Sequence, residues 1–214
     1  MKRTTVFALL LSAAANAASP GMAAAASGAG AGKTPAATPL KQPSVVLQPY
    51  TLKNGLKVYI VEQHHAPVYS IAVTYNVGSR DEVAGRTGFA HLFEHMMFQG
   101  SENVGKAEHF VLISNNGGVM NGSTSLDRTN YFQTLPANQL ELGIWLEADR
   151  MRSLDVSQEN LDNQRNAVQE ERRLRYDNNP YGTVFEKLFG LTFDNFAYKH
   201  PSICLLYTSD AADE

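Results

Sequence analysis

Two histidines and a glutamate stand close together in the stretch GFAHLFEHMMFQG, residues 88–100. His91 and His95 are four residues apart, so on an α-helix their imidazole rings lie one above the other on one face. Two imidazole nitrogens that converge in this way are suited to binding one Zn²⁺ ion. Glu94 directly precedes His95, and its carboxylate emerges beside this face without being forced into the ligand set. Such a carboxylate can serve as the general base for a water molecule activated by the metal.

The pattern HxxEH leaves two other interpretations open. It can occur by chance, and a histidine pair on a helix can simply be hydrogen-bonded or solvated. The flanking residues favour the metal interpretation, because nearly every other position of the stretch is apolar. We therefore expect a buried helix, in which histidines and a carboxylate are costly unless paired or bound to a metal. The apolar positions are Phe89, Ala90, Leu92, Phe93, Met96, Met97 and Phe98.

A third ligand must come from elsewhere, because catalytic zinc usually has three protein ligands and one position open to water. Glu170 and Glu171, on a predicted second long helix, are the candidates. Both have an alternative role, since QEERRLRYD is typical of a charged helix face on which carboxylates pair with Arg173 or Arg175. Spacing does not choose between the two glutamates. A structural zinc site with no open position is a further alternative, disfavoured because no fourth side-chain ligand is evident.

Composition favours a globular protein. The chain has 214 residues, of which 43% are hydrophobic and 18% charged, and its formal net charge is −3. This length allows one domain of ordinary size with a sizeable core. The chain has no run of lysine or arginine, so we expect no nucleic-acid partner.

The first 17 residues have the features of a signal peptide. Two basic residues precede an apolar run at 6–15, and residues 15–17 form a small-x-small cleavage site. The run is too short to span a bilayer comfortably, so we expect cleavage, export to the periplasm or the exterior, and no stable membrane insertion. An uncleaved anchor is the alternative. Residues 18–43 are mostly Ala, Gly, Ser, Thr and Pro, which predicts a disordered tether.

Hydrophobic periodicity predicts strands and helices in alternation after residue 45. Asn54-Gly55 lies between β-prone runs and predicts a hairpin over 50–62. Further strands are predicted at 68–77, 119–126 and 129–135, the last two as a pair.

Helices are predicted at 106–114, 138–152, 158–176 and 181–191. In the second of these, apolar residues recur at helical spacing at Leu140, Ile144, Trp145 and Ala148. Ser157 is the predicted N-cap of the third, which Asp177-Asn178-Asn179-Pro180 ends.

Three separated blocks resemble the pitrilysin, insulinase and mitochondrial processing peptidase family of inverzincin zinc peptidases: GRTGFAHLFEHMMFQGS, GGVMNGSTSLDRTNYF and RNAVQEERR. The resemblance implies an α+β fold, with an antiparallel sheet packed against helices. It also implies a zinc-dependent endopeptidase that hydrolyses peptides or unfolded polypeptides. In the family pattern His91, His95 and Glu171 hold one Zn²⁺ per active site, and Glu94 is the general base. The resemblance thus selects Glu171 over Glu170.

The resemblance further implies that substrate adds as an extended strand to an exposed sheet edge. Asn121, Gly122, Ser123 and Thr124 match the family's edge strand, where NAxT is usual, so glycine replaces alanine here. An ordinary internal strand is the alternative. Gln164 matches the position of a second-shell glutamate in some members; it can hydrogen-bond a ligand histidine but brings no charge.

The resemblance runs from about residue 45 to residue 201, which we assign to the N-terminal part of a zinc peptidase domain. Residues 202–214, SICLLYTSDAADE, have no periodicity and look like translated sequencing-adapter DNA, so we expect a non-native tail on a fragment of a chain roughly twice as long. We expect the fragment itself to be weakly active or inactive. The family needs a second, similar domain, so we expect a homodimer or a paired homologous subunit. The alternative function is a non-catalytic peptide-binding or partner subunit, which the intact HxxEH and matching glutamate disfavour.

Overall fold

A computed structural model describes residues 45–203. The predicted signal peptide, the predicted tether and all of the predicted tail except Ser202 and Ile203 lie outside the described residues. Residues 45–203 combine antiparallel strands with helices, so the predicted α+β class is confirmed. Among these residues, no helix is both long enough and apolar enough to cross a membrane.

The first two strands form the predicted hairpin. β1 (Gln48–Thr51) pairs antiparallel with β2 (Lys57–Ile60), and Tyr50 lies opposite Val58. Gly55 has a φ of 86°, a left-handed conformation that glycine adopts without a steric cost, and the Leu52 amide donates to the Leu56 carbonyl across the turn. The Asn-Gly signal therefore identified the turn correctly.

A separate sheet of three antiparallel strands supports the predicted site. Its strands are β3 (Val68–Tyr75), β4 (Val119–Thr124) and β5 (Thr129–Pro136), in the order β3-β5-β4. The predicted pairing of the last two is confirmed, since Gly122 lies opposite Tyr131. Within residues 45–203, β4 has a partner on one side only, so it is an edge strand.

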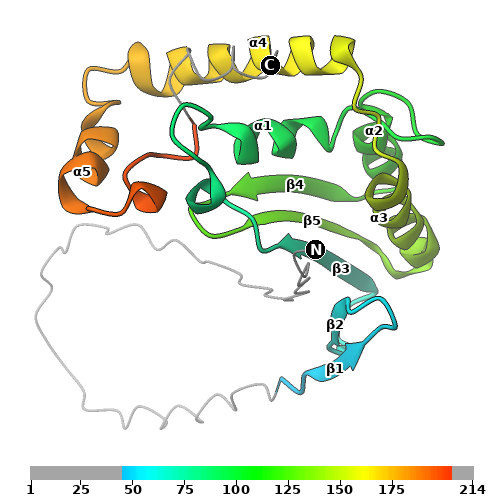
Figure 1. Cartoon of the computed structure of the whole chain (residues 1–214). Coiled ribbons are helices and arrows are strands. Elements are labelled where there is room, and N and C mark those ends of the chain that lie inside the picture. Colours follow the sequence, from blue (N-terminus) through cyan, green and yellow to red (C-terminus); the bar gives the residue numbers. More distant parts are fainter. Residues whose placement is uncertain (1–44, 204–214) are drawn as a thin grey trace, which may run out of the picture.

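Helices cover one face of this sheet in two layers. α1 (Phe89–Met96) lies between the sheet and α4 (Gln158–Arg172), while α3 (Leu140–Ser153) crosses the end of the sheet near the start of β4 (Figure 1). The Ser157 side chain accepts from the Asn160 amide, which confirms the predicted N-cap of α4. α4 ends earlier than predicted and continues as a π-helical turn, Arg173–Asp177. Residues 45–203 contain five α-helices: α1 (Phe89–Met96), α2 (Glu108–Asn115), α3 (Leu140–Ser153), α4 (Gln158–Arg172) and α5 (Val184–Thr192).

The hydrophobic core lies where α2 and α3 meet the sheet. Its buried centre is formed by Val104, Ile113, Leu135 and Leu146. The prediction that the apolar stripe with Ile144 and Trp145 faces the core is wrong, because these side chains are 53% and 44% exposed. That helix instead turns Leu146, Glu147 and Arg150 inward. Burial of Glu147 and Arg150 is tolerable because they form an ion pair at 2.6 Å.

The expectation that α1 is buried all round is also corrected. His91, Leu92 and Met96 are buried, but Phe93 is 47% exposed. The sheet and α4 cover two sides of the helix and leave the third side open among the described residues. A nearly continuous apolar sequence therefore does not imply a fully buried helix.

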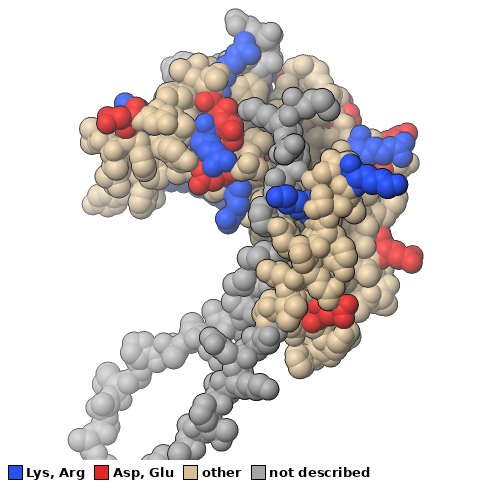
Figure 2. Space-filling view, turned by 60° about the horizontal axis from the view of Figure 1, so that its bottom comes forward, with Lys and Arg blue, Asp and Glu red and all other residues tan. Residues whose placement is uncertain are grey.

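The surface carries charges of both signs. In Figure 2, acidic and basic side chains are intermixed and separated by broad areas of other residues. On α4, Arg165 pairs with Asp162 at 3.2 Å, and Glu170 pairs at 2.9 Å with Arg173 of the π-helical turn that follows, each across one helical turn. The predicted charged face of this helix is therefore present, and local ion pairs run along it.

Candidate metal centre

α1 and the C-terminal end of α4 bring the three predicted ligands together. His91 and His95 lie on one face of α1, with their ring centroids 4.7 Å apart. Glu171 Oε2 is 3.5 Å from His91 Nε2 and 3.2 Å from His95 Nε2. One ligand atom from each of these residues lies within 4.8 Å of the other two. Glu170 faces away from this cluster, and its Oε2 accepts from Arg173.

The surroundings of His95 fit a bound cation. Its Nδ1 lies 3.3 Å from Gln164 Oε1, while its Nε2 faces Glu171 Oε2. The orientation of the Gln164 amide follows from its Nε2, which donates to Asn163 Oδ1 at 2.8 Å. A neutral imidazole can donate from only one nitrogen, yet both nitrogens of His95 face oxygen. With Nδ1 protonated, the lone pair on Nε2 and the carboxylate oxygen need a positive charge between them, which a metal ion or a second proton would supply.

The pKa shifts of the three predicted ligands are consistent with a bound cation. Burial and the neighbouring His95 lower the pKa of His91 to about 4, so this ring is neutral near pH 7, as a ligand must be. Burial lowers the pKa of His95. Its hydrogen bond and its attraction to Glu171 raise that pKa by more than burial lowers it, so the net shift is upward. The hydrogen bond from His95 lowers the pKa of Glu171, which therefore stays ionised, and Arg175 binds Glu171 Oε1 at 2.9 Å.

Glu94 lies beside the three predicted ligands, and a residue of β4 holds its carboxylate. Its Oε2 accepts a hydrogen bond from Thr124 Oγ1 at 2.5 Å. Burial raises the pKa of Glu94, and the Thr124 bond only partly offsets that rise. A raised pKa brings a glutamate closer to the range in which it can take and return a proton near neutral pH. A Cβ added to Gly122 would lie 3.0 Å from Glu94 Oε1, so the glycine in this strand leaves room for the carboxylate.

The cluster opens into a cavity of about 500 Å³ that runs along β4. Within β4, Asn121 and Ser123 are exposed, while Gly122 and Thr124 are half-buried toward α1. The cavity therefore joins the three predicted ligands to the strand that the family resemblance implies as the edge strand. Its wall includes His91, Glu94, His95, Asn121, Gly122, Ser123, Thr124, Gln164 and Glu171.

One contact of this site was not assigned from the sequence, and one was assigned only as an alternative. Thr124 was named only as part of a substrate strand, yet its hydroxyl bonds Glu94; no local pattern predicts such a contact, because it depends on α1 packing against β4. Arg175 was considered as an ion-pair partner that would argue against a ligand role for Glu171. In the structure one carboxylate has both neighbours, because Glu171 binds Arg175 through Oε1 and faces the histidines through Oε2.

Comparison with known proteins agrees with the fold. The chain is 38% identical over 144 residues to the zinc protease PqqE of Helicobacter pylori, covering 67% of this chain and 32% of PqqE. It is 29% identical over 118 residues to a probable mitochondrial-processing peptidase subunit beta of Schizosaccharomyces pombe, covering 55% and 26% of the two chains. A crystal structure of a protease from Helicobacter pylori superposes with a TM-score of 0.75 at 34% identity, covering 78% of this chain and 40% of that one.

The chain thus spans about a third of the length of PqqE, at 32%. The profile of the insulinase family, peptidase family M16, matches residues 57–204. That match includes α1, β4 and α4, the three elements that form the candidate metal centre. The chain therefore belongs to the insulinase family, peptidase family M16.

Proposed function

We propose that this chain carries the catalytic centre of a zinc-dependent endopeptidase. The convergence of His91 Nε2, His95 Nε2 and Glu171 Oε2 is the observation that carries the proposal. Two imidazoles and one carboxylate are a common ligand set of catalytic zinc and leave a fourth position for water or substrate. The name of the related Helicobacter pylori protein, a zinc protease, supports the same metal. Bound there, Zn²⁺ would polarise the scissile carbonyl and acidify water.

Glu94 is the proposed general base. It takes a proton from the attacking water and later passes that proton to the nitrogen of the leaving amine. Thr124 holds one of its oxygens, so the carboxylate stays directed at the site throughout. Gln164 orients His95 by accepting from Nδ1, which leaves Nε2 as the ligand atom.

The open edge of β4 is the proposed substrate site. A peptide or an unfolded polypeptide would add there as an extended strand along Asn121, Gly122, Ser123 and Thr124, with main-chain hydrogen bonds supplying most of the affinity. The Gly122 amide donates to the Asn121 side chain at 2.8 Å, and a substrate carbonyl would take the place of that side chain. Such binding is tolerant of sequence, because it relies on backbone groups.

Export and pairing complete the proposal. Residues 1–17 would direct export to the periplasm or the exterior and would then be removed, which leaves residues 18–43 as the predicted tether ahead of the peptidase part, 45–201. One relative is named a beta subunit of a processing peptidase, which supports a homodimer or a homologous partner that completes the substrate site.

The experiment that tests the function is replacement of the proposed base. In the full-length polypeptide, Glu94→Gln should retain one zinc ion, measured by atomic absorption, because Glu94 is not a ligand. Cleavage of quenched fluorescent peptides should fall by at least about a hundredfold, the usual range for loss of a general base.

Wild-type protein that binds zinc but cleaves no peptide would favour the alternative of a non-catalytic peptide-binding subunit. Retained turnover in Glu94→Gln would remove Glu94 from its proposed role.

A further inference from the structure

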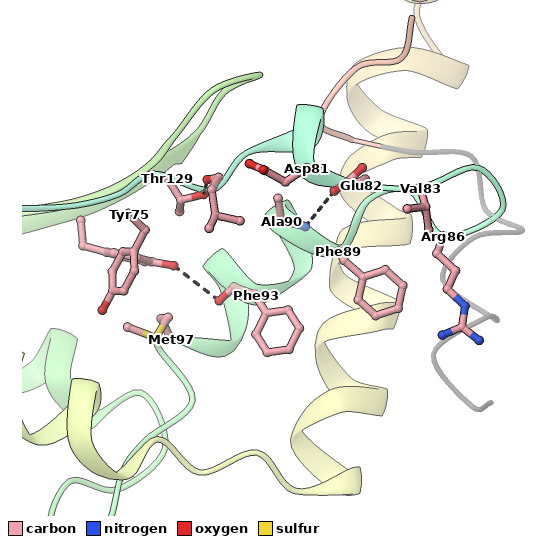
Figure 3. Close-up of a pocket in the computed structure, with 12 residues that line it drawn as sticks. Tyr75, Asp81, Glu82, Val83, Arg86, Phe89, Ala90, Phe93, Met97 and Thr129 are labelled. Atoms are coloured by element: carbon pink, nitrogen blue, oxygen red, sulfur yellow. Dashed lines mark hydrogen bonds between the residues drawn. The ribbon is translucent and has the colours of Figure 1, made fainter. Parts of the chain in front are cut away.

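The first turn of α1 is held by a carboxylate from outside the helix. The helix begins after Gly88, which has a left-handed φ of 96° and no side chain to cap the free amides, and no acidic residue lies in the first turn. Glu82, which follows the short 3-10 turn Ser79–Asp81, supplies the missing cap. Its Oε2 accepts from the Gly88 amide at 2.8 Å and its Oε1 from the Ala90 amide at 2.9 Å. Figure 3 shows this carboxylate directed at the Ala90 nitrogen.

Glu82 is also fixed from its other side. His200 Nδ1 lies 3.6 Å from Glu82 Oε2, and the two side chains are only 12% and 5% exposed. The His200 ring in turn packs on Phe196, with ring centroids 4.9 Å apart. A buried carboxylate with two backbone donors and an imidazole around it has little freedom to move, so it can set the position of the amides that it binds.

The place of this cap matters for the metal centre. α1 has only 8 residues, and helices of this length are marginal without external support. Ala90, the second amide bound by Glu82, directly precedes His91, and His95 follows one turn later. A rotation or fraying of the first turn would therefore carry His91 away from Glu171 before it affected any other part of the site.

We propose that Glu82 is a positioning residue that clamps the first turn of α1 and thereby directs His91 and His95 at Glu171. This role rests on the proposed zinc site. Glu82 itself touches neither the ligands nor Glu94 through any contact described above; it acts through the backbone of Gly88 and Ala90. A negative charge at a helix N-terminus adds a favourable interaction with the helix dipole.

Glu82→Gln is the sharpest test because it keeps the shape of the side chain. The amide has one acceptor oxygen and one NH₂ group, so one of the two backbone N–H groups would face another donor. We expect the affinity for Co²⁺ and Zn²⁺ to fall about tenfold, corresponding to loss of one hydrogen bond to a charged group. The visible spectrum of bound Co²⁺, which reports ligand geometry, should change as well.

Asp81→Asn is the matched control. Asp81 is the preceding residue and its Oδ2 accepts from the Gly78 amide at 3.2 Å, so it supports the turn before α1 but not α1 itself. The same loss of charge there should leave metal affinity and the Co²⁺ spectrum unchanged. Both variants are titrated as the full chain under conditions in which circular dichroism shows the metal-free form folded, so a change in affinity is not a change in the folded fraction.

The outcomes separate this role from the metal centre. Wild-type affinity and spectrum in folded Glu82→Gln would overturn the positioning role, and a lowered unfolding midpoint alone would make Glu82 a purely structural cap. If Glu82→Gln does not fold, Glu82→Asp, which keeps the charge with a shorter reach, should bind metal more weakly than wild type, and unchanged binding would again overturn the role. A wild-type chain that binds no zinc would instead overturn the proposed metal centre.

Discussion

Glu170 and Glu171 are neighbours in sequence with different surroundings in the fold. Successive residues of a helix point about 100° apart, so only one of them can face α1. Which one does so depends on how α4 lies over α1, and no local pattern records that. The family resemblance selected Glu171, and the structure places its Oε2 3.2 Å from His95 Nε2. The histidine pair, by contrast, could be read from spacing alone, because both rings lie on one helix.

The two glutamates form a matched pair for mutation. Glu171→Gln should weaken zinc binding by at least about a hundredfold, since it removes a charged ligand and leaves only two imidazoles. Glu170→Gln should bind zinc as wild type does, because it removes only an exposed ion pair with Arg173. Zinc content after dialysis against a competing chelator measures both, and equal content in the two variants would contradict the choice of Glu171.

At the scale of elements, the order of strands and helices was predictable but the buried face of α3 was not. Leu140, Ile144 and Trp145 form an apolar stripe at helical spacing, yet all three are exposed in residues 45–203. Periodicity identifies a helix and its stripes, but it does not say which stripe meets the sheet. Here the helix buries a charged pair, which sequence reasoning assigns to solvent because it cannot see that the two charges neutralise each other.

The buried pair of Glu147 and Arg150 predicts a large effect on stability. Arg150 also lies over the Tyr131 ring, 4.5 Å from its centroid. Glu147→Ala would leave that guanidinium buried without its partner, and the free energy of unfolding should fall by about 3–5 kcal/mol. Glu141→Ala, at an exposed position of the same helix, should change it by less than about 0.5 kcal/mol. Urea unfolding followed by circular dichroism measures both, and similar small losses would contradict the importance of the pair.

Asp149, next to this pair, predicts a pH dependence of stability. It accepts from Ser101 Oγ at 2.6 Å and from Asn103 Nδ2 at 2.7 Å, and these bonds lower its pKa. A lowered pKa in the folded state contributes stability above the ordinary aspartate pKa, and that stability is lost as the pH falls below about 4. Asp149→Asn should therefore flatten the dependence of the unfolding free energy on pH in this acidic range. An unchanged slope would show that the Asp149 carboxylate contributes little.

At the scale of the whole molecule, the hairpin, the separate strands, the pairing of β4 with β5 and the helices followed from periodicity and turn residues, but the pairing of β3 with β5 did not. The layering of α4 over α1 did not, because it joins segments that are distant in sequence. That layering brings the third predicted ligand to the first two, so the complete candidate site required either the fold or the family resemblance. The chain spans only 32% of the length of PqqE. The exposure of apolar side chains such as Phe93 and Trp145 is therefore their exposure in residues 45–203 alone.

The proposed ligands come from both α1 and α4, and this has a consequence for unfolding. A metal ion shared by the two helices would act as a cross-link that closes a long chain loop, and only the native state could bind it with full affinity. At a free zinc concentration of one hundred times Kd, the native state would gain about 2.7 kcal/mol. Calorimetry with and without a chelator should therefore show a melting temperature several degrees lower after zinc is removed, with no such difference in Glu171→Gln. A chelator would then act on this protein as reduction acts on one that depends on a disulfide, and the released α4 should become the first target of an added protease.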